Sequence, residues 1–510
     1  MKTRRAGAAL VLTGAAVAQI GCSLILDLKD RTDTWGGGGA GGGGSPPACV
    51  PHESNAPVAD VCGIFVSSSL GADKAGSGSK AHPFKTLAAA TVAAGKAKLP
   101  VFACAETFTE PVKIASEVAI FGGLDCTKAW AYDATTKSKL TALSDQIPLT
   151  LSQTATSVQI FDFTIQAADA MLDGGSSIAV IAVQMTASCT RCDLISGDAK
   201  KGRDGTTPTE NVGPTISGND PLIRGNNGVD ACASTTQSLG GDPKDNQLCP
   251  AANGGPLGGN GGYGAVPSGG AGSAYPESEQ TALGGSGQTF DPSWTCIVAG
   301  GANGHKGQNA ADGGGAVGMF ALGKLDAHGL TGASGMTGFD AKPGQGGGGG
   351  GGAKGKAGCA GASGGGGGAG GCGGHGGTGG KAGGASIALV SLGATLVLDA
   401  VTIALGTGGA GGGGGDGQFG GLGGYAGTPG LGNSGTLSGC QGGNGGPGGI
   451  GGKGGGGRGG HAIGIAVNLG ATPDIKGVTF TNPGTPGPGG KGGPMNDGDP
   501  GVQANVQLFP

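Results

Sequence analysis

Two related stretches in the C-terminal third of the chain decide the fold: Gly383-Gly-Ala-Ser-Ile387-Ala-Leu-Val390-Ser-Leu392-Gly-Ala-Thr395 and Gly459-Gly-His-Ala-Ile463-Gly-Ile465-Ala-Val467-Asn-Leu469-Gly-Ala-Thr472. Each continues into a second apolar run, which ends in Val-Thr-Ile403 or in Val-Thr-Phe480. The two copies keep the same spacing, because 403 − 392 and 480 − 469 are both 11. Self-similarity of this kind predicts a repeating unit of two short strands with a turn between them.

Earlier copies of the unit are found upstream. One runs from Gly174 through Ile178 to Gly197, another from Gly314 through Val317 to Gly332, and Phe161–Ile165 matches the second strand alone. One unit cannot bury its inner face, whereas stacked units share a continuous core. We therefore predict an all-β fold, namely a right-handed parallel β-helix (a solenoid) of about six coils.

Glycine-rich tracts separate the copies, and the chain contains 125 Gly in 510 residues. They run roughly over 198–312, 333–382 and 407–458, each after the second strand of one copy and before the Gly-Gly of the next. This placement predicts insertions at one corner of the solenoid. Residues 442–460 repeat as Gly-Gly-x, which suits bundled threefold helices, although mobile loops are an open alternative. The tracts resemble the glycine-rich bacterial surface proteins of the PGRS kind, a likeness that assigns no chemistry.

The first ordered part of the chain carries a second resemblance. Gly71-Ala-Asp73, Gly76-Ser-Gly78 and His82-Pro83-Phe84-Lys85-Thr86-Leu87 precede short apolar runs between Val101 and Gly123. This arrangement resembles the opening of bacterial right-handed parallel β-helix proteins of the pectate-lyase-like class. The resemblance implies a short capping helix before the first coil, which we expect over Pro83–Ala94 because Pro suits a first helical turn.

The N-terminus resembles an export signal, with a basic start at Lys2, Arg4 and Arg5 and an apolar run over 6–18. The apolar run is shorter than the ~20 residues of a membrane span. Two cleavage sites compete. Ala16-Val17-Ala18 fits an ordinary signal peptidase, whereas Gln19-Ile20-Gly21-Cys22 resembles a bacterial lipobox, which implies that Cys22 carries a lipid.

Cysteine parity favours lipidation of Cys22, because the 13 Cys then leave 13 − 1 = 12 for pairing. In an exported chain these are disulfide candidates. They are Cys49, Cys62, Cys104, Cys126, Cys189, Cys192, Cys232, Cys249, Cys296, Cys359, Cys372 and Cys440. Cys189 and Cys192 have a redox-like spacing, but a local disulfide is the simpler interpretation.

These signals divide the chain into nine segments. We expect a signal peptide at 1–21, a lipid anchor and Gly-rich tether at 22–48, and N-terminal coils at 49–197. The three insertions (198–312, 333–382 and 407–458) then alternate with single coils. Those coils are expected at 313–332, at 383–406 and, with the C-terminal tail, at 459–510.

No catalytic constellation is evident. The hydrolase motifs of pectate-lyase-like proteins are missing, and the six His have no metal-ligand spacing. Five Asp recur near the second strands and could form a ladder that binds Ca²⁺, or could each sit in a turn. They are Asp162, Asp193, Asp326, Asp399 and Asp474. A net charge of −4 without a basic patch argues against a nucleic-acid partner.

We therefore expect a non-catalytic cell-envelope lipoprotein with a structural or adhesive role, at the outer membrane or cell surface of a Gram-negative bacterium. Its expected partners are the membrane, through the lipid, and extracellular polysaccharide or neighbouring surface proteins. The alternative is a polysaccharide-binding or polysaccharide-cleaving β-helix protein. A third hypothesis is a decayed solenoid that serves only as a spacer.

Overall fold

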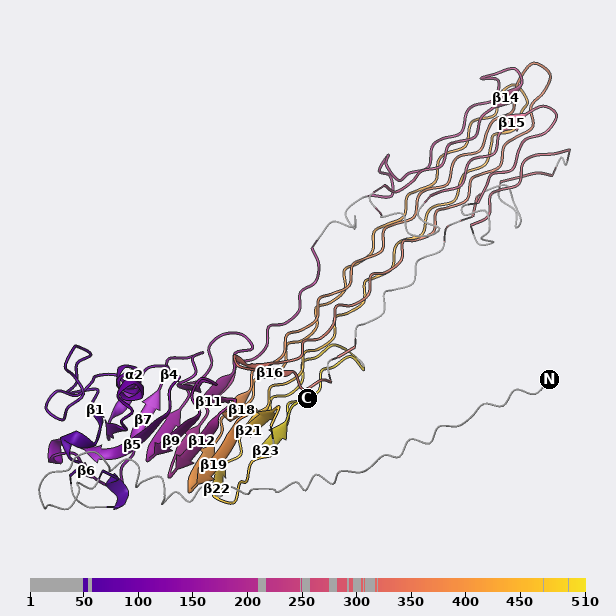
Figure 1. Cartoon of the computed structure of the whole chain (residues 1–510). Coiled ribbons are helices and arrows are strands. Elements are labelled where there is room, and N and C mark those ends of the chain that lie inside the picture. The colour runs from indigo at the N-terminus through magenta and orange to yellow at the C-terminus, as the bar shows by residue number, and fades with distance from the viewer. Residues whose placement is uncertain are drawn as a thin grey trace, which may run out of the picture.

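The computed structural model describes residues 49–53, 57–209, 217–247, 249, 257–274, 282–290, 293–296, 304–305, 307, 317–318, 320–470, 472–493 and 495–510. The signal peptide, Cys22 and the tether therefore lie outside the described residues. Figure 1 shows a strand-rich body from which a long arm of extended chain projects. No helix in the described ranges is both long and apolar enough to cross a membrane.

The body is built from three sheets. Sheet A contains, in order, β1 (Ile64–Val66), β2 (Val101–Cys104), β5 (Val118–Asp125), β9 (Ser157–Phe161), β12 (Thr186–Thr190) and β19 (Thr395–Asp399), and β6 (Ala131–Tyr132) pairs with β5. Sheet B contains β3 (Thr107–Thr109), β7 (Ser138–Thr141), β10 (Phe163–Gln166), β13 (Asp193–Ile195), β20 (Val401–Ala404) and β22 (Val478–Asn482). Sheet C contains β4 (Val112–Ile114), β8 (Leu149–Leu151), β11 (Ser177–Val183), β18 (Ser386–Leu392), β21 (Ala462–Asn468) and β23 (Gln503–Leu508).

Apart from the antiparallel β6, every strand of these sheets pairs in parallel with its neighbours, so the fold is β-rich with few helices. The chain passes from sheet A to sheet B to sheet C and then returns to sheet A, as in the succession β9, β10, β11, β12. The sequence repeat is aligned across strands, because Ile178 pairs with Ile387 and Ile387 with Ile463. Equivalent positions of successive copies therefore lie side by side, as the repeat predicts.

The main core is formed by apolar side chains from all three sheets. Val158 and Val180 belong to it, as do Ile165, Leu389 and Ile465, and all five are buried. Alternation along the strands explains this selection, since alternate residues of a strand point to opposite faces. The outer face of sheet A carries a second cluster, in which Phe65, Phe102, Phe121 and Phe161 stack in register under η1 (Pro51–Glu53) and η2 (Asp60–Cys62).

The capping helix exists but begins later than predicted. Helix α2 spans Leu87–Ala97 rather than Pro83–Ala94, and Thr86 is its N-cap, accepting a hydrogen bond from Ala89 N. Phe84 bonds through its backbone to Phe65 and Ser67 beside β1. These backbone hydrogen bonds hold Phe84 in an extended conformation, so the helix cannot start before Thr86.

The copy expected at 313–332 does not form a coil of the parallel sheets. β16 (Lys324–Asp326) and β17 (Gly329–Thr331) instead make an antiparallel hairpin, with Asp326 Oδ1 accepting from His328 N in the turn. Leu325 packs with Ile178 and Ile387 against the outside of sheet C. The turn at 327–328 is as long as the two-residue corner between β12 and β13, so packing on sheet C, and not turn length, sets the hairpin.

The smaller elements are η3 (Cys126–Lys128), β14 (Gln237–Ser238) and β15 (Gly264–Ala265).

Candidate functional site

Backbone hydrogen bonds join the Gly-rich tracts into a single bundle, which we call the arm (Figure 1). Three successive amides of segment 360–382 donate to three different neighbours, namely Gly365 N to Cys440 O, Gly366 N to Asn226 O and Gly367 N to Gly259 O, at 3.0, 2.9 and 2.8 Å. The next amide, Gly368 N, returns to the first neighbour through Gly443 O. A three-residue repeat is that of a threefold extended helix. Of the two alternatives, the described residues therefore adopt the bundle.

Glycine is required where the arm segments touch. A Cβ added at Gly367 would lie 1.8 Å from the carbonyl oxygen of Gly347, and one at Gly460 would lie 1.6 Å from that of Gly384. Both distances are far below van der Waals contact, so no larger residue fits without separating the segments. The glycine content of the tracts is thus a packing requirement of the arm.

All three tracts leave the body between a strand of sheet B and a strand of sheet C. The first two tracts both lie between β13 of sheet B and β18 of sheet C, and the third lies between β20 and β21 of the same two sheets. Because the hairpin at 324–331 is no coil, the first two tracts form one long excursion.

All twelve candidate cysteines form disulfides. Three of these bonds link residues within the body: Cys49–Cys62, Cys104–Cys126 and Cys189–Cys192. Three join distant segments of the arm: Cys232–Cys359, Cys249–Cys372 and Cys296–Cys440. Cys189 and Cys192 pair with each other, three residues apart. Cross-linking through the arm supports an oxidising compartment.

One edge of the arm is covered at its base and open farther out. Gly408, Gly411 and Gly414 donate to the carbonyl oxygens of Thr485, Pro488 and Lys491, which belong to a segment that then turns away. The next amides of this row (Gly417, Gly420 and Gly423) have no backbone acceptor among the described residues. The covering segment therefore ends where the exposed surface begins.

Large apolar side chains start at this point. Phe419, Leu422, Tyr425 and Leu431 have exposed fractions of 70%, 52%, 48% and 65%. They are spaced by three or six residues and thus share one face of a threefold helix. The neighbouring segment runs antiparallel, with Gly451 N bonded to Gln418 O and Gly448 N to Gly421 O. This register places the exposed Ile450 opposite Phe419.

We call Phe419, Leu422, Tyr425, Leu431 and Ile450 the apolar row. At its base Lys453 Nζ lies 3.1 Å from Asp416 Oδ1. An open groove of about 490 Å³ adjoins this ion pair, lined by Phe320, Lys453, Lys491, Gly493, Met495 and Asp497. Exposed apolar side chains gathered on one surface are typical of interaction sites.

The five aspartates proposed as a calcium ladder do not come together. Asp162 bonds Arg191, Asp193 bonds Lys137 and Thr164, Asp326 and Asp474 accept amides in their own turns, and Asp399 is exposed at the end of β19. Of the two alternatives, the turn interpretation holds for Asp326 and Asp474, and the five residues form no ladder because they lie at different corners and sheets. Among the described residues no three His, Cys, Asp or Glu side chains form a metal-binding group.

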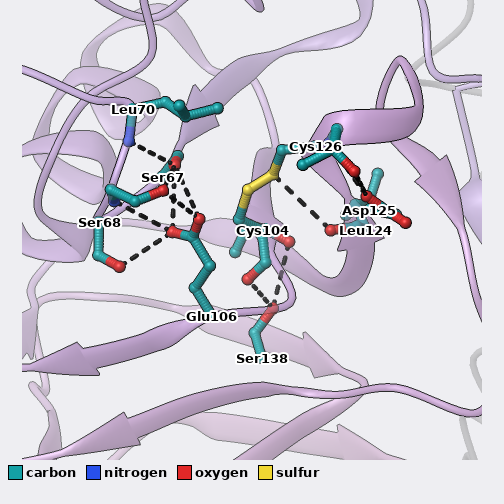
Figure 2. The surroundings of a disulfide bond; sticks show 12 residues. Ser67, Ser68, Leu70, Cys104, Glu106, Leu124, Asp125, Cys126 and Ser138 are labelled. Atoms are coloured by element: carbon teal, nitrogen blue, oxygen red, sulfur yellow. Dashed lines mark hydrogen bonds between the residues drawn. A yellow bond between two sulfur atoms is a disulfide. The ribbon is translucent and has the colours of Figure 1, made fainter.

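A carboxylate that the sequence did not single out is held by a serine loop (Figure 2). Glu106 accepts hydrogen bonds from the hydroxyls of Ser67, Ser68 and Ser69 and from Ser69 N, at 2.5–3.3 Å. Burial opposes ionisation of Glu106, but these hydrogen bonds outweigh it and lower its pKa. Since each donor is satisfied locally and the Cys104–Cys126 disulfide lies beside it, the cluster anchors the loop after β1.

No family model, no curated protein and no solved structure matches this chain. Of the candidate site, the sequence indicated the arm and its cysteines. It did not single out the apolar row, although the three-residue spacing of Phe419, Leu422 and Tyr425 within a Gly-rich tract was a usable signal.

Proposed function

We propose that this chain is a non-catalytic, exported surface protein whose arm is an adhesive element. In this proposal sheets A, B and C are the three faces of a right-handed parallel β-helix. Two observations support it: from β2 to β21 the strands of the body, apart from β6, follow the order sheet A, sheet B, sheet C, and all their pairing is parallel apart from that of β6 with β5. Parallel connections of this type are right-handed in nearly all proteins.

The apolar row is the observation that carries the adhesive role. It lies on a segment cross-linked into a bundle, so its side chains are presented without a large loss of conformational freedom on binding. Burying one large apolar side chain contributes about 1.5–3 kcal/mol. A row of several such residues therefore has enough surface for a stable contact.

The proposed location is the outer membrane or cell surface of a Gram-negative bacterium, with a lipid on Cys22. Six disulfides support an oxidising compartment. The mass of the N-terminal peptide of the mature protein tests the anchor. A diacylglyceryl group on Cys22 is expected, and an N-terminus at Gln19 without lipid would contradict it.

Adhesion is tested on bacteria that display the full chain. Binding to acidic and neutral polysaccharides, to apolar beads and to cells lacking the protein is compared with that of Phe419→Ser/Leu422→Ser. The matched control is Met336→Ser/Phe339→Ser, which removes two exposed apolar residues from another arm segment. We expect the first variant to lose at least tenfold in binding to one surface and the control to bind normally. Equal binding by both variants, at equal display, would remove the apolar row from the proposal.

A polysaccharide-binding face is the second candidate, and sheet B favours it. Six residues align in register across its strands, and none is fully buried: Thr107, Lys139, Thr164, Asp193, Thr402 and Thr479. Such a flat polar column could contact a linear glycan. Thr164→Val/Thr402→Val should abolish retention on a polysaccharide column if this face binds. Shortening of the polysaccharide by the full chain, measured by size exclusion, would instead support the cleaving alternative.

A further inference from the structure

The two ends of the body differ in how they are covered. At the end formed by β1, β3 and β4, helix α2 packs Leu87, Ala90 and Ala94 into the main core. The Glu110 carboxylate accepts hydrogen bonds from Leu87 N and Ala88 N at 2.8 and 3.1 Å and ties the helix to the turn between β3 and β4. This end is therefore closed by the chain itself.

The opposite end consists of β19, β22, β23 and the irregular segment 472–477, which lies beside β19, since a Cβ at Gly477 would be 2.5 Å from Leu398 O. Figure 1 shows this end far from α2. Each of these strands pairs along one side only, with β12, β20 and β21 respectively. Their sequences are Thr-Leu-Val-Leu-Asp399, Val-Thr-Phe-Thr-Asn482 and Gln-Ala-Asn-Val-Gln-Leu508. They contain no Lys, Arg or Pro, which are the residues that normally protect an edge strand from pairing with another chain.

The main core also reaches the surface at this end. Six apolar side chains pack on the core yet are only partly buried: Leu396, Leu398, Ile475, Val478, Phe480 and Val506. One strand farther in, the side chains that pair with Phe480 and Val506 are fully buried, namely Ile403 and Ile465. The apolar centre of the body thus lacks a covering layer in the described part of the chain.

We propose that a second copy of this chain covers this end, giving a closed dimer in which the two ends meet. A partner that covers this end must offer apolar side chains at its centre and unpaired strand edges around them. The same end of a second copy offers both. The other end cannot serve, because α2 covers it, so head-to-tail stacking into a filament is blocked. A two-fold contact of identical surfaces closes after two copies. The inference rests on the strand pairing and not on the adhesive function.

In the proposed dimer the two-fold axis passes beside β23. It places the β23 strands of the two copies antiparallel, edge to edge, with their free backbone groups available to each other. β23 has no charged side chain, so pairing brings no like charges together. Gln503 and Asn505 are exposed side chains of this strand, and lysines there would face each other across the axis.

The test is analytical ultracentrifugation of the full chain carrying Cys22→Ser, exported into an oxidising compartment. A dimer that does not grow with concentration is expected. Gln503→Lys/Asn505→Lys should weaken dimerisation at least tenfold, because four lysines would crowd the axis. The matched control is Thr107→Lys, an exposed position of β3 at the end that α2 covers, and it should remain dimeric. Circular dichroism establishes that both variants keep the wild-type strand content.

Three results would overturn the proposal. A monomer at all concentrations up to about 100 μM excludes a contact of useful strength. Open-ended polymers would show that the contact does not close. A monomer that becomes dimeric only after removal of residues 1–48 would assign this end to the chain's own N-terminal segment. If the lysine variants fail to fold, a disulfide between the two copies of Asn505→Cys supplies a second readout, and its absence counts against the dimer.

Discussion

Arg191 holds the carboxylate of Asp162 through two hydrogen bonds, with Nε donating to Oδ1 at 2.7 Å and Nη2 to Oδ2 at 2.8 Å. The Asp162 side chain is only 3% exposed. Both residues have left-handed φ values, 57° and 54°, and each occupies the corner between sheets A and B on successive passages of the chain. The pair therefore links two neighbouring passages at the same corner.

Removing Arg191 should destabilise the fold, because it leaves the buried Asp162 carboxylate without its positive partner. We expect Arg191→Met to lower the free energy of unfolding by about 2 kcal/mol, less than for a fully buried pair because Arg191 is one-third exposed. Urea denaturation measures it. Asp162→Asn/Arg191→Met should recover most of the loss, since no charge is then left unpaired. Equal stability of the single and double variants would mean that the ion pair is not what stabilises the corner.

Close contact in the arm predicts a strong response to one methyl group. Gly367→Ala places a Cβ 1.8 Å from Gly347 O, so the two segments must separate, at a cost of about 1–3 kcal/mol. Gly413→Ala is the control, because its nearest neighbour is 3.2 Å away. Amide hydrogen exchange should accelerate in segment 344–370 for the first variant only. Similar exchange in both would contradict the packing of the bundle.

The arm disulfides should matter more than the local one in the body. Cys249 and Cys372 are 123 residues apart, whereas Cys189 and Cys192 are 3 apart. Closing a long loop removes more entropy from the unfolded chain, typically worth 2–4 kcal/mol. We expect Cys249→Ser/Cys372→Ser to make the arm sensitive to limited proteolysis while the body stays intact. Cys189→Ser/Cys192→Ser should have a cleavage pattern close to wild type, and the opposite ranking would refute this account.

We expect His461 to make the junction of body and arm sensitive to acid. Its Nδ1 accepts from Val502 N and its Nε2 lies against Leu322 O, both at 2.8 Å. Burial lowers the pKa of His461, Arg458 lowers it further, and the Leu322 carbonyl opposes the shift in part. The unfolded chain therefore binds a proton first, at a pKa near 6.5.

Stability from His461 is accordingly complete above pH 6.5 and falls as the pH drops from there toward the lower pKa of the folded state. Thermal unfolding at pH 8 and pH 5 measures the difference. His461→Gln should reduce this pH dependence, whereas His328→Gln, at an exposed histidine of the hairpin turn, should leave it unchanged. An unchanged pH dependence in His461→Gln would exclude this histidine as its source.

Several features of the fold were predictable from local patterns. The alternation of apolar residues around Ile387 and Ile463 predicted strands, and the shared spacing of the two copies predicted their alignment. The Gly-Gly-x period suited threefold helices but left mobile loops open, and the hydrogen bonds of the arm decided between the two. The hairpin at 324–331 was not predictable, because its apolar residues and its two-residue turn match those of a coil, and only its antiparallel pairing and its packing on sheet C decide otherwise. The start of α2 depended on the bridge between Phe84 and Phe65, a contact with a separate strand.

The candidate site was likewise predictable only in part. The cysteines and the Gly-rich tracts were evident in composition, but the apolar row needs a surface, and exposure is a property of the packed arm. The aspartate ladder failed because sequence spacing does not say at which corner a side chain lies.

By itself the sequence determined the short apolar strands, the three-residue glycine period and the parity of the cysteines, because each follows from neighbours within a few residues or from counting. Only the tertiary structure decided which cysteines pair, that separate tracts join in one arm, and which end of the body stays open. Those outcomes depend on contacts between residues as distant as Cys296 and Cys440, which are 144 positions apart. No local pattern encodes such contacts, since they form when whole segments pack.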